Sequence, residues 1–300
     1  MMKLSHESKV RLGVGIGAFV LIIGLVFGTS RLLAHSDMVR TTGILSGHLS
    51  DFDDVVDDDD FMNDGGNYSA RPQQLSSETF DADAFTSLDL DVTSGTVEVK
   101  HVSGGPVRVI ESGRVATGTV AFDAATQNLA EIKGSTLKIR QFDCDDERAI
   151  DRTVTVELPR EVADNLVGIT AKVGSGDLTV AGIACHDLNL TLDSGDVEFT
   201  GTVTDTLNAE VGSGDVTFEL YQAPAKSMDV SVGSGDVEIT VPNSTGFKAS
   251  LTVGSGDFES DFLPLGYDGE TILNHEFDNG DKSATYRFKV GSGDMSFDPE

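Results

Sequence analysis

The amino-acid sequence predicts an all-β fold, a parallel β-solenoid with rungs of about 20 residues. Two observations predict it: the pentapeptide Val-Gly-Ser-Gly-Asp recurs five times, and short segments with alternating apolar and polar residues flank each copy. A third observation, an uncharged stretch near the N-terminus, predicts one transmembrane helix and a disordered acidic linker ahead of the solenoid.

The predicted transmembrane helix covers residues 12–33. Nineteen uncharged residues lie between Arg11 and Arg31. At about 1.5 Å per residue they span roughly 28 Å, close to the thickness of a bilayer core. A cleaved signal peptide is the alternative, although its apolar region is usually only about 7 to 15 residues long. Gly28 and Ser30 would suit a cleavage site, so this alternative stays open.

The charges on either side of this helix predict its orientation. Residues 1–11 contain three Lys and Arg side chains, whereas Arg31 and Arg40 follow the apolar stretch. The positive-inside rule therefore places the N-terminus in the cytoplasm. We expect a single-pass protein of the cell membrane with an extracellular C-terminal domain.

Residues 34–79 have the composition of a disordered linker. The segment Asp51–Asp60 places seven carboxylates in ten residues, and their mutual repulsion should keep the chain extended. The spacing does not fit an EF-hand calcium loop, because Met62 occupies a ligand position in either register. A solvated spacer is the prediction, with weak, nonspecific cation binding as the alternative.

The charge of the chain excludes one class of partner. The net charge is -29, from 50 acidic and 21 basic side chains, and a nucleic-acid binder needs a basic patch. The charge is unevenly distributed: residues 1–35 carry +3, residues 36–85 carry -10, and the remainder carries -22. We therefore expect no nucleic-acid partner.

The repeat predicts the solenoid at residues 80–300. Between Ser94 and Ser292 the sequence accommodates ten periods of about 20 residues, with Ser112 and Ser135 near intermediate points. Eleven rungs stacked about 4.8 Å apart would make a rod on the order of 50 Å long. The serines of the repeat, with spacings of 19, 19, 21, 21 and 37, are Ser175, Ser194, Ser213, Ser234, Ser255 and Ser292.

The residues around each pentapeptide predict two strands joined by a corner. Apolar residues alternate with polar ones in Leu207–Val211 and again in Val216–Leu220, which is the pattern of half-buried strands. A continuous strand would place Val211 and Val216 on opposite faces, so a corner must intervene. We expect Gly212 and Gly214 to supply positive backbone torsions there. An antiparallel sandwich is the alternative, but identical corners at a fixed period favour a solenoid.

This pattern of strand, Gly-Ser-Gly-Asp and strand over residues 80–300 resembles a bacterial adhesin-like family of unknown function, the DUF4097 domain. The resemblance implies a β-solenoid at the cell surface with no known catalytic residues. A membrane anchor ahead of such a domain also resembles envelope proteins of Gram-positive bacteria. Residues 100–165 lack the pentapeptide, which leaves the rung boundaries there undefined.

Stacked corners would align their aspartates in a column. Carboxylates about 5 Å apart repel by about 1 kcal/mol per pair in water, so some compensation is expected. The aspartates either cap the turns by accepting backbone N–H bonds or hold divalent cations such as calcium in a ladder. The candidate metal ligands are Asp177, Asp196, Asp215, Asp236 and Asp257. No other cofactor is expected.

The two cysteines, Cys144 and Cys185, lie 41 residues or about two periods apart. Rungs two apart are separated by about 9.6 Å, beyond the roughly 7 Å limit between the Cα atoms of a disulfide. Cys144, however, belongs to a polar segment, Gln141–Asp151, that could fold over. Because an exported protein can be oxidised, a disulfide between these residues is an open possibility.

The repeated acids do not point to catalysis. Glycoside-cleaving carboxylates need different environments, whereas these recur identically, and the chain contains no Trp for sugar stacking. We expect no catalytic residues and a noncatalytic adhesion or binding module of a Gram-positive-type envelope. The alternative is an envelope-stress sensor or regulator that captures cationic peptides or binds a membrane protein.

The C-terminus predicts a further contact. The chain ends at Glu300, directly after the strand-like Met295–Phe297 and without a polar cap. An open terminal rung exposes strand edges, so we expect weak self-association through the C-terminal rung.

Overall fold

The computed structural model describes residues 68–69, 71–116, 129–140, 149–263 and 275–300. They belong to one compact unit, Asn63–Glu300. Within the described ranges, no helix is long and apolar enough to cross a membrane. The predicted cytoplasmic segment 1–11 and transmembrane helix 12–33, together with most of the predicted linker, lie outside the described residues, so these expectations stay predictions.

The described chain is all-β, as predicted, apart from the one-turn helix α2 (Arg160–Ala163). Its strands form an 18-stranded sheet in which most neighbours are parallel. The strands are β1 (Gln73–Phe80), β2 (Ser87–Val92), β3 (Thr96–Val102), β4 (Val107–Val115), β5 (Ala130–Lys133), β6 (Thr136–Arg140), β7 (Ala149–Pro159), β8 (Leu166–Val173), β9 (Asp177–Leu192), β10 (Asp196–Val211), β11 (Asp215–Gln222), β12 (Ser227–Val232), β13 (Asp236–Val241), β14 (Phe247–Val253), β15 (Phe258–Glu259), β16 (His275–Asn279), β17 (Ala284–Val290) and β18 (Asp294–Pro299).

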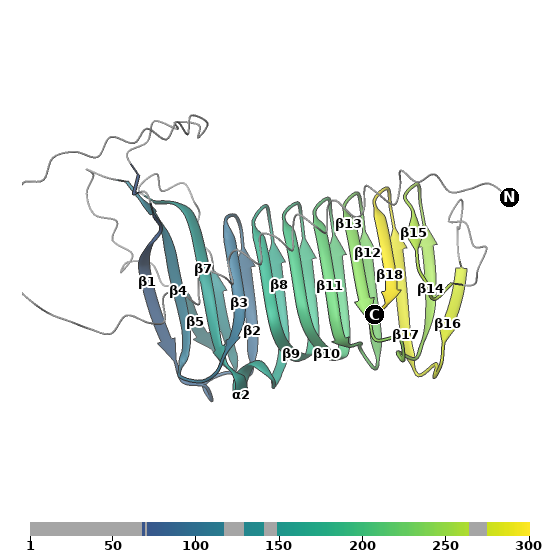
Figure 1. Cartoon of the computed structure of the whole chain (residues 1–300), viewed down its shortest axis with the longest axis horizontal. Coiled ribbons are helices and arrows are strands. Elements are labelled where there is room, and N and C mark those ends of the chain that lie inside the picture. Colours follow the sequence, from purple (N-terminus) through teal and green to yellow (C-terminus); the bar gives the residue numbers. More distant parts are fainter. Residues whose placement is uncertain (1–67, 70, 117–128, 141–148, 264–274) are drawn as a thin grey trace, which may run out of the picture. The chain divides into compact units, whose positions relative to one another are not determined.

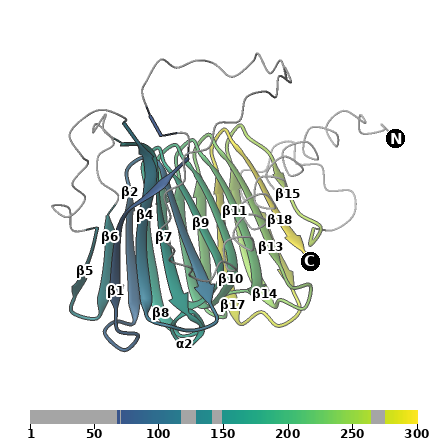
Figure 2. The same ribbon diagram turned by 60° about the vertical axis from the view of Figure 1, so that its left-hand side comes forward.

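The sheet folds into two layers, because each repeated corner turns the chain from one layer into the other (Figures 1 and 2). The strands that precede the corners form the layer that we name sheet I, and those that follow them form sheet II. Sheet I contains, in spatial order, β5, β6, β2, β8, the second halves of β9 and β10, β12, β17, β14 and β16. Sheet II contains β1, β4, β7, β3, the first halves of β9 and β10, β11, β13, β18 and β15.

A rung consists of one sheet I strand, a corner and one sheet II strand. In the middle of the molecule, rungs follow the sequence repeat: Asp177 pairs with Asp196, and Asp196 pairs with Asp215, in parallel register. Alternate side chains point inward, as in β12, where every second side chain is buried. The alternation and spacing of the sequence therefore predict these rungs correctly.

The count of ten periods is wrong at the N-terminal side. The corner at Ser94 stacks directly on the corner at Ser175, where the amide of Ser175 donates to the carbonyl of Thr93 at 3.1 Å. Strand β2 pairs with β8, and β3 pairs with β9, across these corners. Those residues between Ser94 and Ser175 that the structure describes form no further corner of this kind. Ser112 lies within β4, and Ser135 lies in the tight β5–β6 hairpin.

The C-terminal rung was expected to be the open end of the stack, but it does not lie at the end. Strands β17 and β18 lie between two rungs that precede them in the chain, β12–β13 on one side and β14–β15 on the other (Figure 1). The described part of the 37-residue interval between Ser255 and Ser292 forms no further corner of this kind. Strand β17 is paired along both edges, whereas β18 is paired with β13 along its length and with β15 only at Met295 and Ser296. The expected self-association through the C-terminal rung stays a prediction.

Antiparallel strands cover the outer parts of the stack. At one end, β1 and β4 extend sheet II antiparallel to β7, and β5 pairs antiparallel with β6 in sheet I. At the other end, β16 pairs antiparallel with β14. The fold is thus a parallel stack with antiparallel additions, which a purely parallel interpretation of the repeat does not anticipate.

Close stacking, and not positive backbone torsion, explains the corner glycines. Among the glycines of the seven corners, only Gly95 has a positive φ, so the torsions expected for Gly212 and Gly214 were wrong. A Cβ atom on Gly214 would lie well under 3.0 Å from the carbonyl oxygen of Gly195 in the next rung, and Gly235 meets Gly214 in the same way. Glycine is needed because the corner backbones touch.

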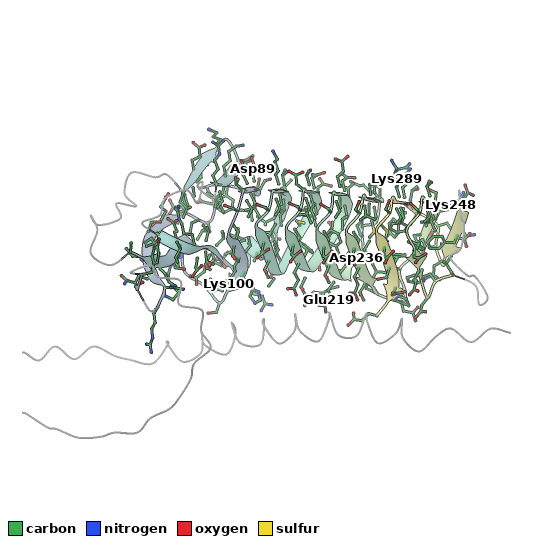
Figure 3. The ribbon with its side chains drawn as sticks, turned by 90° about the horizontal axis from the view of Figure 1, so that it is seen from above. Asp89, Lys100, Glu219, Asp236, Lys248 and Lys289 are labelled. Atoms are coloured by element: carbon green, nitrogen blue, oxygen red, sulfur yellow. The ribbon has the colours of Figure 1, made fainter. Side chains whose placement is uncertain are left out.

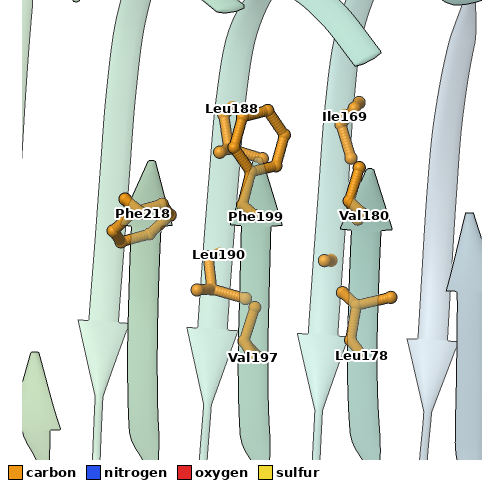
Figure 4. Close-up of a pocket in the computed structure, with 9 residues that line it drawn as sticks. Ile169, Leu178, Val180, Leu188, Leu190, Val197, Phe199 and Phe218 are labelled. Carbon is orange, nitrogen blue, oxygen red and sulfur yellow. The ribbon is translucent and has the colours of Figure 1, made fainter. Parts of the chain in front are cut away.

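The interior between the two sheets is packed with apolar side chains. Near β14, Phe247 of sheet I meets Phe297 of sheet II with ring centroids 5.3 Å apart. The cavity shown in Figure 4 has a volume of about 10 Å³ and is lined by Val180, Leu188 and Phe199 among other apolar residues. Such a volume holds one water molecule at most. A ligand of this part of the chain must therefore contact its outer surfaces.

Candidate functional site

The predicted column of corner aspartates exists, and its carboxylates accept backbone hydrogen bonds. The amide of Asp236 donates to Oδ1 of Asp215 at 3.2 Å, and the amide of Asp294 donates to Oδ1 of Asp236 at 3.3 Å. The amide of Asp257 donates to Oδ1 of Asp294 at 3.1 Å. These bonds provide the compensation that stacked carboxylates need. In spatial order the column contains Asp177, Asp196, Asp215, Asp236, Asp294 and Asp257.

The candidate calcium ladder stays a prediction. Within the described ranges, no group of three or more His, Cys, Asp and Glu side chains is arranged to hold a metal ion. The hydrogen bonds between neighbouring aspartates give these side chains a structural role that requires no cation.

The column is the first of three rows of outward side chains on sheet II. In the second row, acids alternate with hydroxyl residues from rung to rung: Glu98, Thr179, Glu198, Thr217, Glu238, Ser296 and Glu259. The third row contains Lys100, Ala181, Thr200, Glu219, Thr240, Asp298 and Asp261. Over these seven rungs sheet II presents thirteen carboxylates and one ammonium group. We name this surface the acidic face.

Sheet I differs sharply over the same seven rungs. Its three outward rows contain five carboxylates, Asp89, Asp91, Asp187, Glu210 and Asp229, and four cations, Lys172, Lys248, Arg287 and Lys289. Figure 3 shows Asp89, Lys248 and Lys289 on one side of the molecule and Lys100 and Glu219 on the other. The repeat produces part of this difference, because the aspartate of each Gly-Ser-Gly-Asp corner lies on sheet II. The acids of the second and third rows, which the pentapeptide does not contain, produce the rest.

Burial, and to a smaller extent neighbouring carboxylates, raises the pKa of two acids in the acidic face. Burial raises the pKa of Glu198, and the nearby Glu219 raises it further. Burial also raises the pKa of Glu238, with a smaller contribution from Asp298. One carboxylate oxygen of Glu198 is buried without a hydrogen-bond partner in the described structure. The acidic face therefore stores electrostatic repulsion that a cationic ligand would relieve.

An exposed aromatic ring lies within the acidic face. Tyr221 is 55% exposed, and it follows Glu219 on the outward side of β11. Burial of part of the residue raises the pKa of its hydroxyl, and Glu219 and Glu300 contribute further. The alternating segment Val216–Leu220 ends one residue before Tyr221, so the sequence pattern did not single this residue out, whereas β11 continues to Gln222 and presents Tyr221 outward.

The remaining sequence candidates fall in different places. Cys185 is a free, buried thiol, and burial raises its pKa to about 12. Its proposed partner Cys144 lies outside the described residues, so the disulfide stays a prediction.

At the turn opposite the corners, the ammonium group of Lys226 binds the carboxylate of Asp205 at 2.7 Å, with Nδ1 of His186 3.8 Å from the same carboxylate.

The fold and its outer rows define an all-β repeat protein with one strongly acidic face. Residues 76–297 match the family model described as Toastrack DUF4097, and the chain belongs to this family. The family to which the strand-corner-strand pattern pointed is thereby confirmed. No curated protein matches the chain.

The chain is also similar to solved structures from three bacteria. A proposed cell adhesion protein from Clostridium sporogenes is 12% identical, with 77% of this chain and 100% of that chain covered and a TM-score of 0.41. A proposed adhesin from Bacteroides fragilis is 15% identical, with coverage of 76% and 98% and a TM-score of 0.35. A proposed lipid-binding protein from Parabacteroides distasonis is 13% identical, with coverage of 77% and 98% and a TM-score of 0.32.

Proposed function

We propose that this chain is a noncatalytic binding module at the surface of a Gram-positive-type cell, anchored through residues 12–33, and that its acidic face binds cationic partners. The observation that carries the proposal is the unequal charge of the two sheets: thirteen carboxylates and one cation on sheet II, against five and four on sheet I. A one-sided charge of this size attracts and orients ligands of opposite sign.

The geometry of the acidic face favours an elongated ligand. Neighbouring rungs lie about 4.8 Å apart, so the carboxylates recur along the stack at a fixed short interval. A peptide rich in lysine and arginine can lie along these rows and neutralise several carboxylates at once. Each contact is weak because the side chains are partly solvated, and the affinity depends on their number.

Tyr221 gives the face a specific anchor. A lysine or arginine side chain can stack on its exposed ring while Glu219 accepts a hydrogen bond from the cation. Exposed tyrosines of this kind are frequent energetic centres of interfaces. Replacement of Tyr221 by Ala should therefore weaken binding more than replacement of an outlying carboxylate.

The direct test measures binding of a lysine- and arginine-rich peptide to the full-length chain by fluorescence anisotropy, with an acidic peptide of equal length as the control ligand. The affinity should fall steeply as NaCl rises from about 50 mM to about 500 mM, because salt screens exposed charges. The variant Glu198→Gln/Glu219→Gln/Glu238→Gln should bind the cationic peptide more weakly.

A matched variant on sheet I, Asp187→Asn/Glu210→Gln/Asp229→Asn, removes the same number of charges and should leave binding nearly unchanged. Equal losses in both variants would mean that net charge, and not the acidic face, determines binding. Salt-insensitive binding, or no binding of the cationic peptide, would contradict the proposal.

Two cellular roles are compatible with such binding. As an adhesion module, the protein would hold the cell to a host surface, and its deletion would reduce attachment. As an envelope-stress sensor, it would capture cationic antimicrobial peptides, and its deletion would alter resistance while attachment stayed normal. The charge of sheet II favours the second role, and attachment and resistance assays of one deletion strain separate the two.

A further inference from the structure

The outer surface of sheet I contains a polar depression of about 300 Å³ near the N-terminal end of the described stack. It lies on the sheet opposite the acidic face and spans the three neighbouring strands β6, β2 and β8. The lining residues are Thr136, Lys138, Ser87, Leu88, Asp89, Gly168 and Thr170.

Gly168 creates the depression. In the row that runs across the strands, Thr136 pairs with Ser87, Ser87 pairs with Gly168, and Gly168 pairs with Asp187. The missing side chain leaves a gap in this row. The backbone does not require glycine here, because φ is not positive and an added Cβ would meet only the carbonyl oxygen of Asp187, at 3.5 Å. The gap is therefore not a consequence of close backbone packing.

The hydroxyl groups inside the depression are not used by the fold. Those of Ser87, Thr136 and Thr170 make no side-chain hydrogen bond to any part of the chain that the structure describes. Some outward polar groups elsewhere on sheet I bond to the next rung, as Asn208 does when it donates to Asn189 at 2.9 Å. The depression thus leaves three hydroxyls available to a ligand.

The charged groups in the depression cancel each other. The ammonium group of Lys138 forms an ion pair with the carboxylate of Asp89. Together they offer N–H donors and carboxylate acceptors without a net charge, which disfavours a strongly ionic ligand.

We propose that this depression binds a neutral, polyhydroxylated ligand, a sugar ring of a glycan. The depression spans three strands, with a spacing of about 4.8 Å between neighbours, and two successive outward residues along each strand, about 6.8 Å apart. It therefore covers an area of about 10 by 7 Å, which matches one pyranose ring with its substituents. Sugar hydroxyls both donate and accept hydrogen bonds, as do the three free hydroxyls around the Asp89–Lys138 pair. This binding is separate from the cationic partner of sheet II.

The test is a saturation-transfer NMR titration of the full-length chain with the methyl glycosides of glucose, galactose, mannose and N-acetylglucosamine. At least one glycoside should bind saturably. Gly168→Leu, which fills the depression, should weaken that binding by at least about tenfold. Ser87→Ala/Thr170→Val, which keeps the shape but removes two hydroxyls, should weaken it to an intermediate degree.

Two controls separate this proposal from the proposed function. Thr179→Val removes an outward hydroxyl on sheet II and should change nothing, and glycoside binding should not respond to salt or to the Glu198→Gln/Glu219→Gln/Glu238→Gln variant. If no glycoside binds saturably, or if Gly168→Leu binds as well as the unmodified chain, the proposal is wrong whatever the cationic peptide does.

Discussion

Ser255 and Ser292 lie side by side on neighbouring corners, with their hydroxyl oxygens 3.4 Å apart, although 37 residues separate them in the chain. The amide of Ser292 donates to Gly233, which precedes Ser234. The order of these corners in space is therefore Ser234, Ser292, Ser255. The last strand pair of the chain is inserted between two rungs that are adjacent in sequence.

Paired cysteines should report this order. In a Cys144→Ala background, Ser255→Cys/Ser292→Cys should oxidise readily to a disulfide in the full-length chain. Ser234→Cys/Ser255→Cys should stay reduced, because the residues are two rungs or about 9.6 Å apart and a disulfide needs Cα atoms within roughly 7 Å. Free-thiol counting measures both. Oxidation of only the second pair would show that the rungs stack in sequence order.

Gly214→Ala should destabilise the protein strongly, because its Cβ would collide with the carbonyl of Gly195. Overpacking of this kind costs about 1–3 kcal/mol or more. Gly168→Ala is the matched control, because its Cβ meets nothing closer than 3.5 Å, and it should leave stability unchanged or raise it by about 0.5 kcal/mol. Urea unfolding measures both, and equal stabilities would contradict close stacking as the reason for the corner glycines.

The described domain should become more stable as the pH falls through the raised pKa values of several sheet II carboxylates toward their ordinary values of 3.8 and 4.5. Burial raises the pKa of several sheet II carboxylates, so the folded chain binds protons more readily than the unfolded chain. Their contribution to stability is complete below the ordinary values of 3.8 and 4.5 and is lost as the pH rises through the raised values. The groups are Asp177, Glu198, Asp236, Glu238 and Asp298.

Thermal unfolding as a function of pH measures this effect. The Glu198→Gln/Glu238→Gln variant should show a flatter dependence, because two of the titrating groups are gone. The exposed Asp205, whose pKa Lys226 lowers, acts in the opposite direction. A melting temperature that only falls on acidification would contradict the prediction.

Calcium should raise the melting temperature more than NaCl of equal ionic strength if the corner aspartates hold cations. If they act only as turn caps, the two salts should act alike, because both merely screen the repulsion. Asp215→Asn/Asp236→Asn should abolish any calcium-specific increase. An identical melting temperature with calcium and with chelator at constant ionic strength would rule out a structural ladder.

Cys185 should not react with a thiol reagent in the native protein, because it is buried and its pKa is raised to about 12. In denaturant without reductant, the chain should show two reactive thiols if no disulfide is present. A disulfide between Cys144 and Cys185 would leave no reactive thiol. The single variant Cys144→Ala provides the control with one thiol. Rapid reaction of the native Cys144→Ala chain would contradict the burial of Cys185.

The local structure of this protein follows from neighbouring residues in the chain. Alternation in segments such as Leu207–Val211 fixes which side chains enter the core, and Gly-Ser-Gly-Asp marks each corner, because both depend on neighbouring residues only. The all-β class, the parallel pairing of the middle rungs and the family follow from these features. The aspartate column follows too, since identical corners at a fixed period must align.

The order in which the corners stack depends on long-range packing. All corners carry nearly the same residues, so Ser94 can stack on Ser175 and Ser292 can enter between Ser234 and Ser255 with the same hydrogen bonds. The candidate surfaces depend on this order. The acidic face joins residues from β3 to β15, and the depression joins Thr136, Ser87 and Gly168 from separate parts of the chain. Equivalent corners leave the order to long-range packing, which a local repeat does not encode.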